Sequence, residues 1–243
     1  TQGYFVAQSD SADLVTSLQI TAPTGVLYAY FIDPGENAVI PFTEGNGDYT
    51  VVGYQQIQGD QYAALYSEIL TVELENDFLP FLYPNQYVNF SPDSEASKLA
   101  LSMVSEDTTD VDALKQIYNY VVNNLTYDYD KAETVETGYL PDVDETLSTK
   151  TGICFDYAAL TTAMLRSCDI PCKLQIGYTG DIKHAWIDVY IRSKGWVTGA
   201  VSFNSDSWSL MDPTFDSSAD SDDTEAIQDY IGNADNYTVQ FTR

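Results

Sequence analysis

The stretch of residues 147–215 constrains the fold of this chain most strongly, because two hydrophobic periods follow each other in it. Residues 154–167 carry apolar side chains around most of a helical circumference, which predicts a buried helix. Residues 184–191 alternate between apolar and polar instead, which predicts a strand with two different faces. Two more apolar runs, GWVTGAVSF and SWSLMD, predict further strands. A helix that is followed by an antiparallel sheet indicates an α+β domain.

Three residues in this stretch have the side chains that cysteine-dependent acyl transfer requires. Cys154 begins the predicted helix after a glycine, His184 begins the alternating strand as the only histidine of the chain, and Asp212 ends a strand before Pro213. A helix N-terminus and a neighbouring imidazole both favour a thiolate, and the first-turn N–H groups can hold an oxyanion. Asp156, in the same first turn, also suits the positive end of the helix dipole. We therefore expect Cys154 as nucleophile, His184 as base and Asp212 as the acid that orients the imidazole.

Each of these residues also has an ordinary structural explanation. A free cysteine is usually a small buried hydrophobe, and Asp-Pro commonly starts a turn. A Cys₃His zinc site is disfavoured, because Cys154 and Cys168 are about 21 Å apart along the predicted helix. The same separation excludes a disulfide between these two. Cys168 and Cys172 flank a turn and could either pair or remain thiols.

The first third of the chain has the pattern of a small β-sandwich. Short runs rich in Val, Ile, Tyr, Leu and Phe are separated by turn clusters, and they lie at 4–8, 14–20, 26–32, 49–56 and 61–74. We therefore expect an immunoglobulin-like sandwich over residues 1–78. The Pro and aromatic residues of 79–91 predict a stiff connection, and residues 92–243 form the expected second domain.

The start of the second domain shows two helix signals. Ser91 before Pro92 predicts the N-cap of a helix near 92–105. Thr109 and Asp112 have the spacing of a capping box before an amphipathic helix. Residues 126–146 are polar and predict a loop that leads to Cys154.

The charge of the chain excludes some partners. The sequence has 37 acidic and 10 basic residues, and no basic residue precedes Lys98. Such a net charge of -27 argues against nucleic acid and anionic membrane surfaces. The acidic run 217–225 could bind Ca²⁺, but a solvated loop is favoured and we expect no cofactor.

The chain shows no apolar run long enough to span a membrane and no signal peptide, so no direct membrane insertion is expected. It opens on Thr rather than Met, so we expect that an upstream piece has been removed. The surface composition favours a secreted or cell-surface location, with an upstream lipid anchor as an open option.

Several short motifs together resemble the transglutaminase-like core of the papain-like cysteine-enzyme superfamily, in a bacterial secreted or surface type of protein. They are Gly152–Ala158, Leu165-Arg166, Ile170-Pro171, Gly177-Tyr178, His184-Ala185-Trp186 and Trp208 followed by Asp212-Pro213-Thr214. The resemblance covers roughly residues 92–242. It implies the roles of nucleophile, base and orienting acid for Cys154, His184 and Asp212.

The sequence departs from the family pattern at two places. A long segment separates Trp196 from Trp208, and no Gln or Trp stands shortly before Cys154 to stabilise an oxyanion. Tyr127 or Tyr139 is the expected substitute, with Trp186 as a supporting residue.

The resemblance implies a class of chemistry rather than one reaction. Relatives include peptidases, amidases, protein crosslinkers and inactive members, so the implied substrate is a protein or peptide amide. Hydrolysis is favoured because it needs no second binding site for an amine. The alternatives are a protein-crosslinking transglutaminase and a catalytically silent binding module. The oligomeric state is left open.

Overall fold

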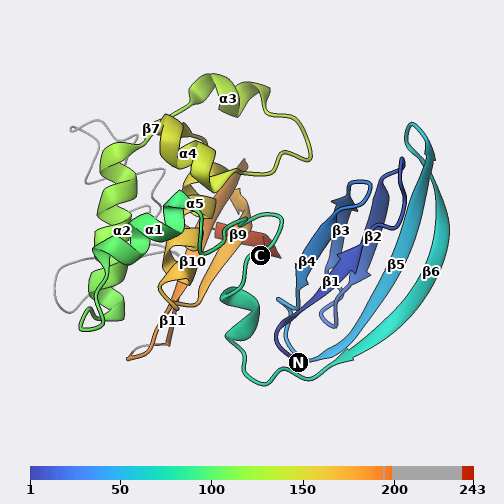
Figure 1. Cartoon of the computed structure of the whole chain (residues 1–243), viewed down its shortest axis with the longest axis horizontal. Helices are drawn as coiled ribbons and strands as arrows, with labels where there is room; N and C mark the ends of the chain where they lie inside the picture. Colours follow the sequence, from blue (N-terminus) through green and yellow to red (C-terminus); the bar gives the residue numbers. More distant parts are fainter. Residues whose placement is uncertain (194, 199–236) are drawn as a thin grey trace. The chain divides into compact units, whose positions relative to one another are not determined.

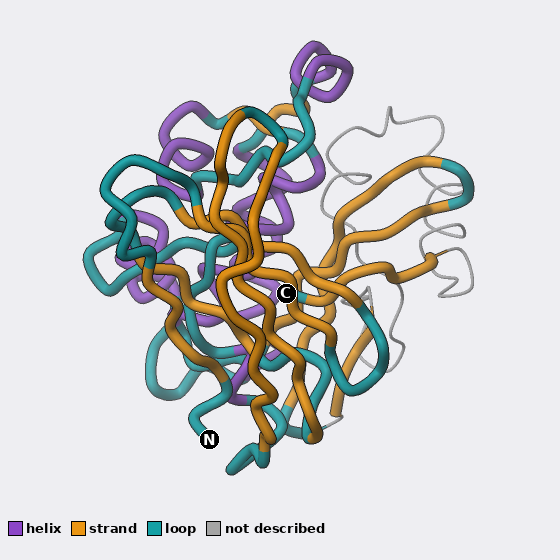
Figure 2. Tube along the Cα trace, turned by 90° about the vertical axis from the view of Figure 1, so that its right-hand side faces the viewer, coloured by secondary structure: helices purple, strands orange, loops and turns teal. Residues whose placement is uncertain are grey.

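The structure is a computed structural model that describes residues 1–193, 195–198 and 237–243. The chain divides into two compact units, Thr1–Gln86 and Tyr87–Arg243. The division lies within the range 79–91, where the sequence predicts the connection between domains. Figure 1 follows the chain through both units in sequence colours, and Figure 2 colours it by secondary structure.

The first unit is built almost entirely from strands. They are β1 (Tyr4–Gln8), β2 (Thr16–Thr21), β3 (Leu27–Ile32), β4 (Asn37–Pro41), β5 (Gly47–Gln58) and β6 (Gln61–Val72), followed by a short 3₁₀ helix, η1 (Leu79–Phe81). One antiparallel sheet has the order β3-β2-β5-β6, and β1 pairs with β4 in a second. The expected strand-rich unit is thus present, while its immunoglobulin-like class stays a prediction.

Alternation along the strands builds the core of this unit. In β3, Tyr28, Tyr30 and Ile32 are buried while the residues between them are exposed. Strand β4 is not predicted from the sequence, since its five residues are bounded by turn clusters and end in Pro41. Proline is tolerated there because Pro41 is the last residue of a strand that pairs only with β1 among the described residues.

The second unit combines helices with an antiparallel sheet, which confirms the mixed helix and strand class. Its helices are α1 (Glu95–Met103), α2 (Asp110–Asn124), α3 (Tyr129–Thr134), α4 (Val143–Thr149) and α5 (Cys154–Ser167). Its strands are β7 (Thr126–Tyr127), β8 (Thr151–Gly152), β9 (Cys172–Thr179), β10 (Ile182–Ile191), β11 (Gly195–Thr198) and β12 (Tyr237–Thr242). The sheet order is β11-β10-β9-β12, and β7 pairs with β8 in parallel.

Helix α5 is the centre of this unit. It contacts β9 and β10 as well as α1, α2 and α4, and every residue from Asp156 to Arg166 is buried. Small residues such as Ala158, Ala159 and Ala163 let neighbouring elements approach closely from all sides. The predicted buried helix is thus confirmed.

Of two predictions for the start of the second unit, the cap of α2 is confirmed and the cap of α1 is wrong. Helix α2 begins as expected, because the Thr109 hydroxyl accepts the backbone N–H of Asp112 at 3.2 Å. The N-cap of α1 is Ser94 and not Ser91. Ser91 instead belongs to the preceding turn, where its N–H donates to the Ser94 hydroxyl at 3.0 Å.

The prediction of a loop over residues 126–146 is wrong, because β7, α3 and the first part of α4 lie there. Asp128 caps α3 by accepting the N–H of Lys131, and Asp142 caps α4 by accepting the N–H groups of Asp144 and Glu145. Helices of six and seven residues are too short to show a helical period in the sequence. Side-chain caps stabilise them instead, and this is why the hydrophobic pattern does not predict them.

In the described part of the chain, no helix combines the length and the apolar character that crossing a membrane requires.

Candidate active site

The nucleophile candidate lies at the N-terminus of the central helix. Cys154 is the first residue of α5, follows the extended residue Ile153, and is partly exposed. Gly152 precedes them in β8, and a Cβ atom there would lie 2.6 Å from the Cβ of Asp156. Only glycine therefore allows the chain to pass so close to the first turn of α5.

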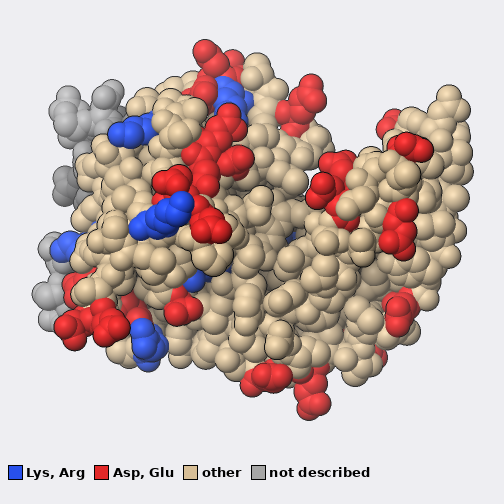
Figure 3. Space-filling view, viewed as in Figure 1, with Lys and Arg blue, Asp and Glu red and all other residues tan. Residues whose placement is uncertain are grey.

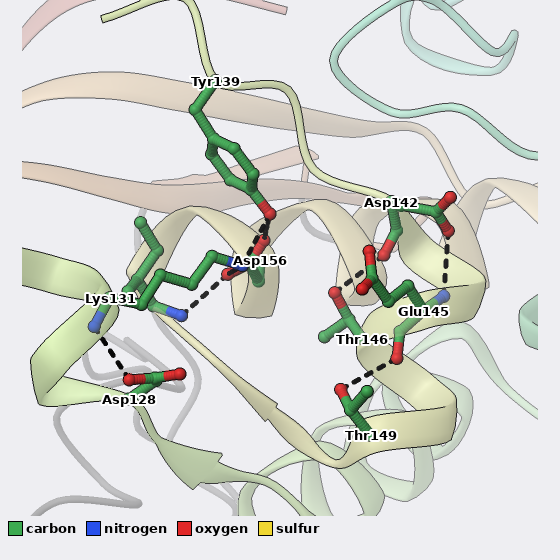
Figure 4. A network of polar contacts seen from close by, with 9 residues as sticks. Asp128, Lys131, Tyr139, Asp142, Glu145, Thr146, Thr149 and Asp156 are labelled. Atoms are coloured by element: carbon green, nitrogen blue, oxygen red, sulfur yellow. Dashed lines mark hydrogen bonds and ion pairs between the residues drawn. The ribbon is translucent and has the colours of Figure 1, made fainter. Parts of the chain in front are cut away.

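The first turn of α5 is held by a buried carboxylate. Asp156 is completely buried, and its Oδ2 accepts the backbone N–H of Ile153 at 2.8 Å and the ammonium group of Lys131 at 2.9 Å. Its Oδ1 accepts the hydroxyl of Tyr139 at 2.5 Å, and Lys131 also donates to that hydroxyl at 2.7 Å. Figure 4 shows the three side chains converging from α3, the following loop and α5. This arrangement satisfies a charge that would be costly to bury alone.

The network also changes the titration of its members. Burial opposes the charge of Lys131, but its hydrogen bonds with Tyr139 and Asp156 outweigh burial and raise the pKa of the ammonium group. Burial, and then the neighbouring Asp156 carboxylate, raise the pKa of Tyr139 to about 12. At neutral pH the network therefore contains a charged lysine and a protonated tyrosine.

His184 is the third residue of β10 and is buried. Its ring stacks on Trp186 with centroids 6.3 Å apart and planes at 16°, and it lies 6.4 Å from the ring of Tyr237 in β12. Ala185 and Ile187 belong to the core around α5, so His184 and Trp186 lie on the other face of β10. The two faces of the strand are thus divided as predicted, and both are buried from His184 to Val189.

The connectivity brings Cys154 and His184 to the same end of this layer. Helix α5 has 14 residues, and after a turn of four residues β9 returns along it. The helix is about 21 Å long, and β9 rises by about 17 Å from Cys172 to Gly177. Gly177 pairs with His184 in antiparallel register. The start of α5 and the start of β10 therefore lie at similar heights, at the end of the second unit where Figure 1 shows α4 and β7.

The remaining predicted site residues have different positions. Tyr127 pairs with Gly152 in the β7–β8 sheet, and its ring lies 6.4 Å from that of Tyr157 in α5. The Tyr139 hydroxyl donates its one proton to Asp156, so in this arrangement it has none for an oxyanion. Asp212, like the motif from Trp208 to Thr214, the predicted strand SWSLMD and the acidic run 217–225, lies outside the described residues.

Lys131 is a site residue that the sequence motifs do not predict. The available signal was that it is the only basic residue of the polar stretch 126–146, shortly before a helix that buries an aspartate. A single basic residue in such a stretch indicates a possible ion pair with a buried carboxylate. The partner, Asp156, is 25 residues away, so only folding brings the two together.

The other two cysteines differ from Cys154 in their surroundings. All three are free thiols in the structure, so Cys168 and Cys172 do not pair. Burial raises the pKa of Cys168 to about 11 and that of Cys172 to about 12. Both thiols are therefore protonated at neutral pH. Within the described residues no group of Cys, His, Asp and Glu side chains could hold a metal ion.

Comparison with known proteins places the region around Cys154 and His184 in a family. The model of the transglutaminase-like superfamily matches residues 97–199. The uncharacterized protein YebA of Bacillus subtilis is 24% identical over 183 residues, which cover 66% of this chain and 25% of YebA. The UPF0252 protein MJ1282 of Methanocaldococcus jannaschii is 40% identical over 62 residues, which cover 24% of this chain and 18% of that protein.

A solved structure of a candidate cysteine protease from Cytophaga hutchinsonii is 17% identical, with a TM-score of 0.49, over 99% of this chain and 83% of that one. The chain spans a quarter or less of the length of the two curated relatives. Residues 97–199, which contain Cys154 at the start of the central helix and His184 on the neighbouring strand, thus form a transglutaminase-like domain.

Proposed function

We propose that the second unit catalyses cysteine-dependent acyl transfer on protein or peptide amides, by hydrolysis. The observation that carries this proposal is the position of Cys154 as the first residue of a buried helix, at the same end of the layer as the only histidine of the chain. The proposal requires the imidazole to reach the thiol around the end of the sheet, since Ala185 and not His184 faces α5.

The proposed reaction begins when His184 takes the thiol proton of Cys154. The thiolate attacks the amide carbon and a C–S bond forms, while N–H groups at the start of α5 stabilise the oxyanion. The C–N bond then breaks, and the imidazolium gives its proton to the leaving nitrogen. Water attacks the thioester while His184 takes one of its protons, and the C–S bond then breaks as the imidazolium gives this proton to the sulfur, which releases the acid and restores the thiol. Asp212 is the proposed acid that orients the imidazole.

Intact-mass spectrometry tests this proposal. The protein and a Cys154→Ala variant are mixed with peptides that carry Gln and Lys side chains. We expect an acyl adduct on Cys154 that is absent from the variant, and products that have gained water. Products joined to an amine with loss of ammonia would instead indicate a crosslinking enzyme. Peptide binding with neither adduct nor product would indicate a silent binding module and contradict the proposal.

A further inference from the structure

Segment 129–140, which comprises α3 and the loop after it, contacts the rest of the second unit through few side chains. One contact is between the rings of Tyr129 and Tyr127, whose centroids lie 4.9 Å apart. All of its residues are exposed except Lys131 and Tyr139, which are partly buried, and α3 contains no buried residue. Burial of apolar surface stabilises an element against local unfolding. Because this segment buries little apolar surface, few of its own contacts hold it against the rest of the unit.

Both partly buried side chains of the segment end on the same acceptor. Lys131 donates to Oδ2 of Asp156 at 2.9 Å, and Tyr139 donates to Oδ1 (Figure 4). The Lys131 ammonium group lies 4.4 Å from the centre of the Tyr139 ring, and this ring meets Phe155 edge to face at 6.3 Å. The segment is therefore joined to the two residues that directly follow Cys154.

The acceptor has a second task at the start of α5. Asp156 accepts the N–H of Ile153 and so fixes the backbone on the N-terminal side of Cys154. Its carboxylate has no solvent exposure, so Lys131 supplies the positive charge that makes the buried anion tolerable. The two side chains of the segment and the backbone N–H of Ile153 thus share one carboxylate.

We propose that Lys131 and Tyr139 form a latch with Asp156 that couples segment 129–140 to the position of Cys154. The inference rests on the proposed function, in which Cys154 is the nucleophile. Lys131 and Tyr139 are positioning residues that act through Asp156. With the latch closed, the first turn of α5 is fixed. With the latch broken, the segment opens and the Cys154 thiol is no longer held in a fixed position.

Two variants break the latch, and two matched variants leave it intact. Tyr139→Phe removes the hydroxyl but keeps the ring against Phe155, and Lys131→Met removes the charge but keeps the stem. Tyr129→Phe changes an exposed tyrosine of the same segment, and Lys98→Met removes an exposed ion pair with Glu95. Tyr139→Phe changes no charge and decides the question if Lys131→Met does not fold.

The readouts are hydrogen exchange of residues 129–140 and 153–157, the rate of Cys154 alkylation from pH 5 to 9, and kcat and KM on a cleaved peptide. We expect exchange at least about tenfold faster in both latch variants. Because misplacing a reacting group by about 1 Å can cost up to about 100-fold, we expect kcat to fall by about tenfold or more with KM nearly unchanged. The two matched variants should behave as wild type.

The outcomes separate the latch from the proposed function. Fast alkylation of wild-type Cys154 with unchanged exchange and alkylation in both latch variants would overturn the latch and leave the function standing. Wild-type alkylation no faster than a free thiol would overturn the function. In that case faster exchange of both segments in the variants still supports the coupling, and unchanged exchange overturns it.

Discussion

At the scale of single residues, replacing Asp156 is expected to reduce the stability of the fold the most. Asp156→Asn removes a buried anion and leaves the Lys131 ammonium group without its carboxylate partner. We expect the variant to be less stable by about 3 kcal/mol, since breaking one side of a buried pair is strongly destabilising. Urea unfolding at pH 7 measures this. Asp130→Asn, an exposed neighbour on α3, is the control, and a loss at Asp156 as small as at Asp130 would contradict the account.

The raised pKa values of Cys168 and Cys172 predict how slowly these thiols react at a given pH. A thiol whose pKa is raised to about 11 or 12 stays protonated in the folded state until the pH rises through that value. Only about one Cys168 in a thousand is then a thiolate at pH 8. We expect native Cys168 and Cys172 to be alkylated at least about 100-fold more slowly than a free thiol at pH 8. Alkylation rates equal to those of the unfolded chain would contradict the burial of these two thiols.

At the scale of elements, the pairing of β9 with β12 depends on one glycine. A Cβ atom on Gly177 would lie 1.9 Å from the backbone oxygen of Thr238, and the register of the pairing shifts nearby, between Val239 and Phe241. We expect Gly177→Ala to cost about 2 kcal/mol or more and to increase hydrogen exchange of residues 237–242. Val239→Ala, an exposed change on β12 opposite Gly177, should have little effect. Equal stability of the two variants would contradict this view of the pairing.

The elements that the sequence predicts well are those with a long hydrophobic period. Helix α2 buries one face, helix α5 buries almost its whole circumference, and strand β10 buries both faces from His184 to Val189, so their residue patterns carry the information. Helices α3 and α4 leave no such pattern, because side-chain caps and contacts with distant residues stabilise them. Cys154 and His184 are predictions from short sequence motifs and their order, whereas the contact of Lys131 with Asp156 exists only after folding.

At the scale of the whole molecule, the distribution of charge is uneven. The first unit has acidic residues and no lysine or arginine, and the face that Figure 3 shows carries only red charges in this unit. Repulsion among like charges destabilises a compact state and is screened by salt. We expect the free energy of unfolding to rise by about 1 kcal/mol between 10 mM and 500 mM NaCl. A fall in stability with salt would contradict a dominant role for self-repulsion.

The central claim is that Cys154 is an activated thiol paired with His184. The most direct measurement is the rate of iodoacetamide alkylation at each cysteine between pH 5 and 9, mapped by mass spectrometry in wild type and in His184→Ala. Since the thiolate is the reactive form, we predict that Cys154 reacts fast well below pH 8.5 and slows in the variant, while Cys168 and Cys172 stay slow in both. A Cys154 that reacts no faster than a free thiol at every pH in both proteins would contradict the claim.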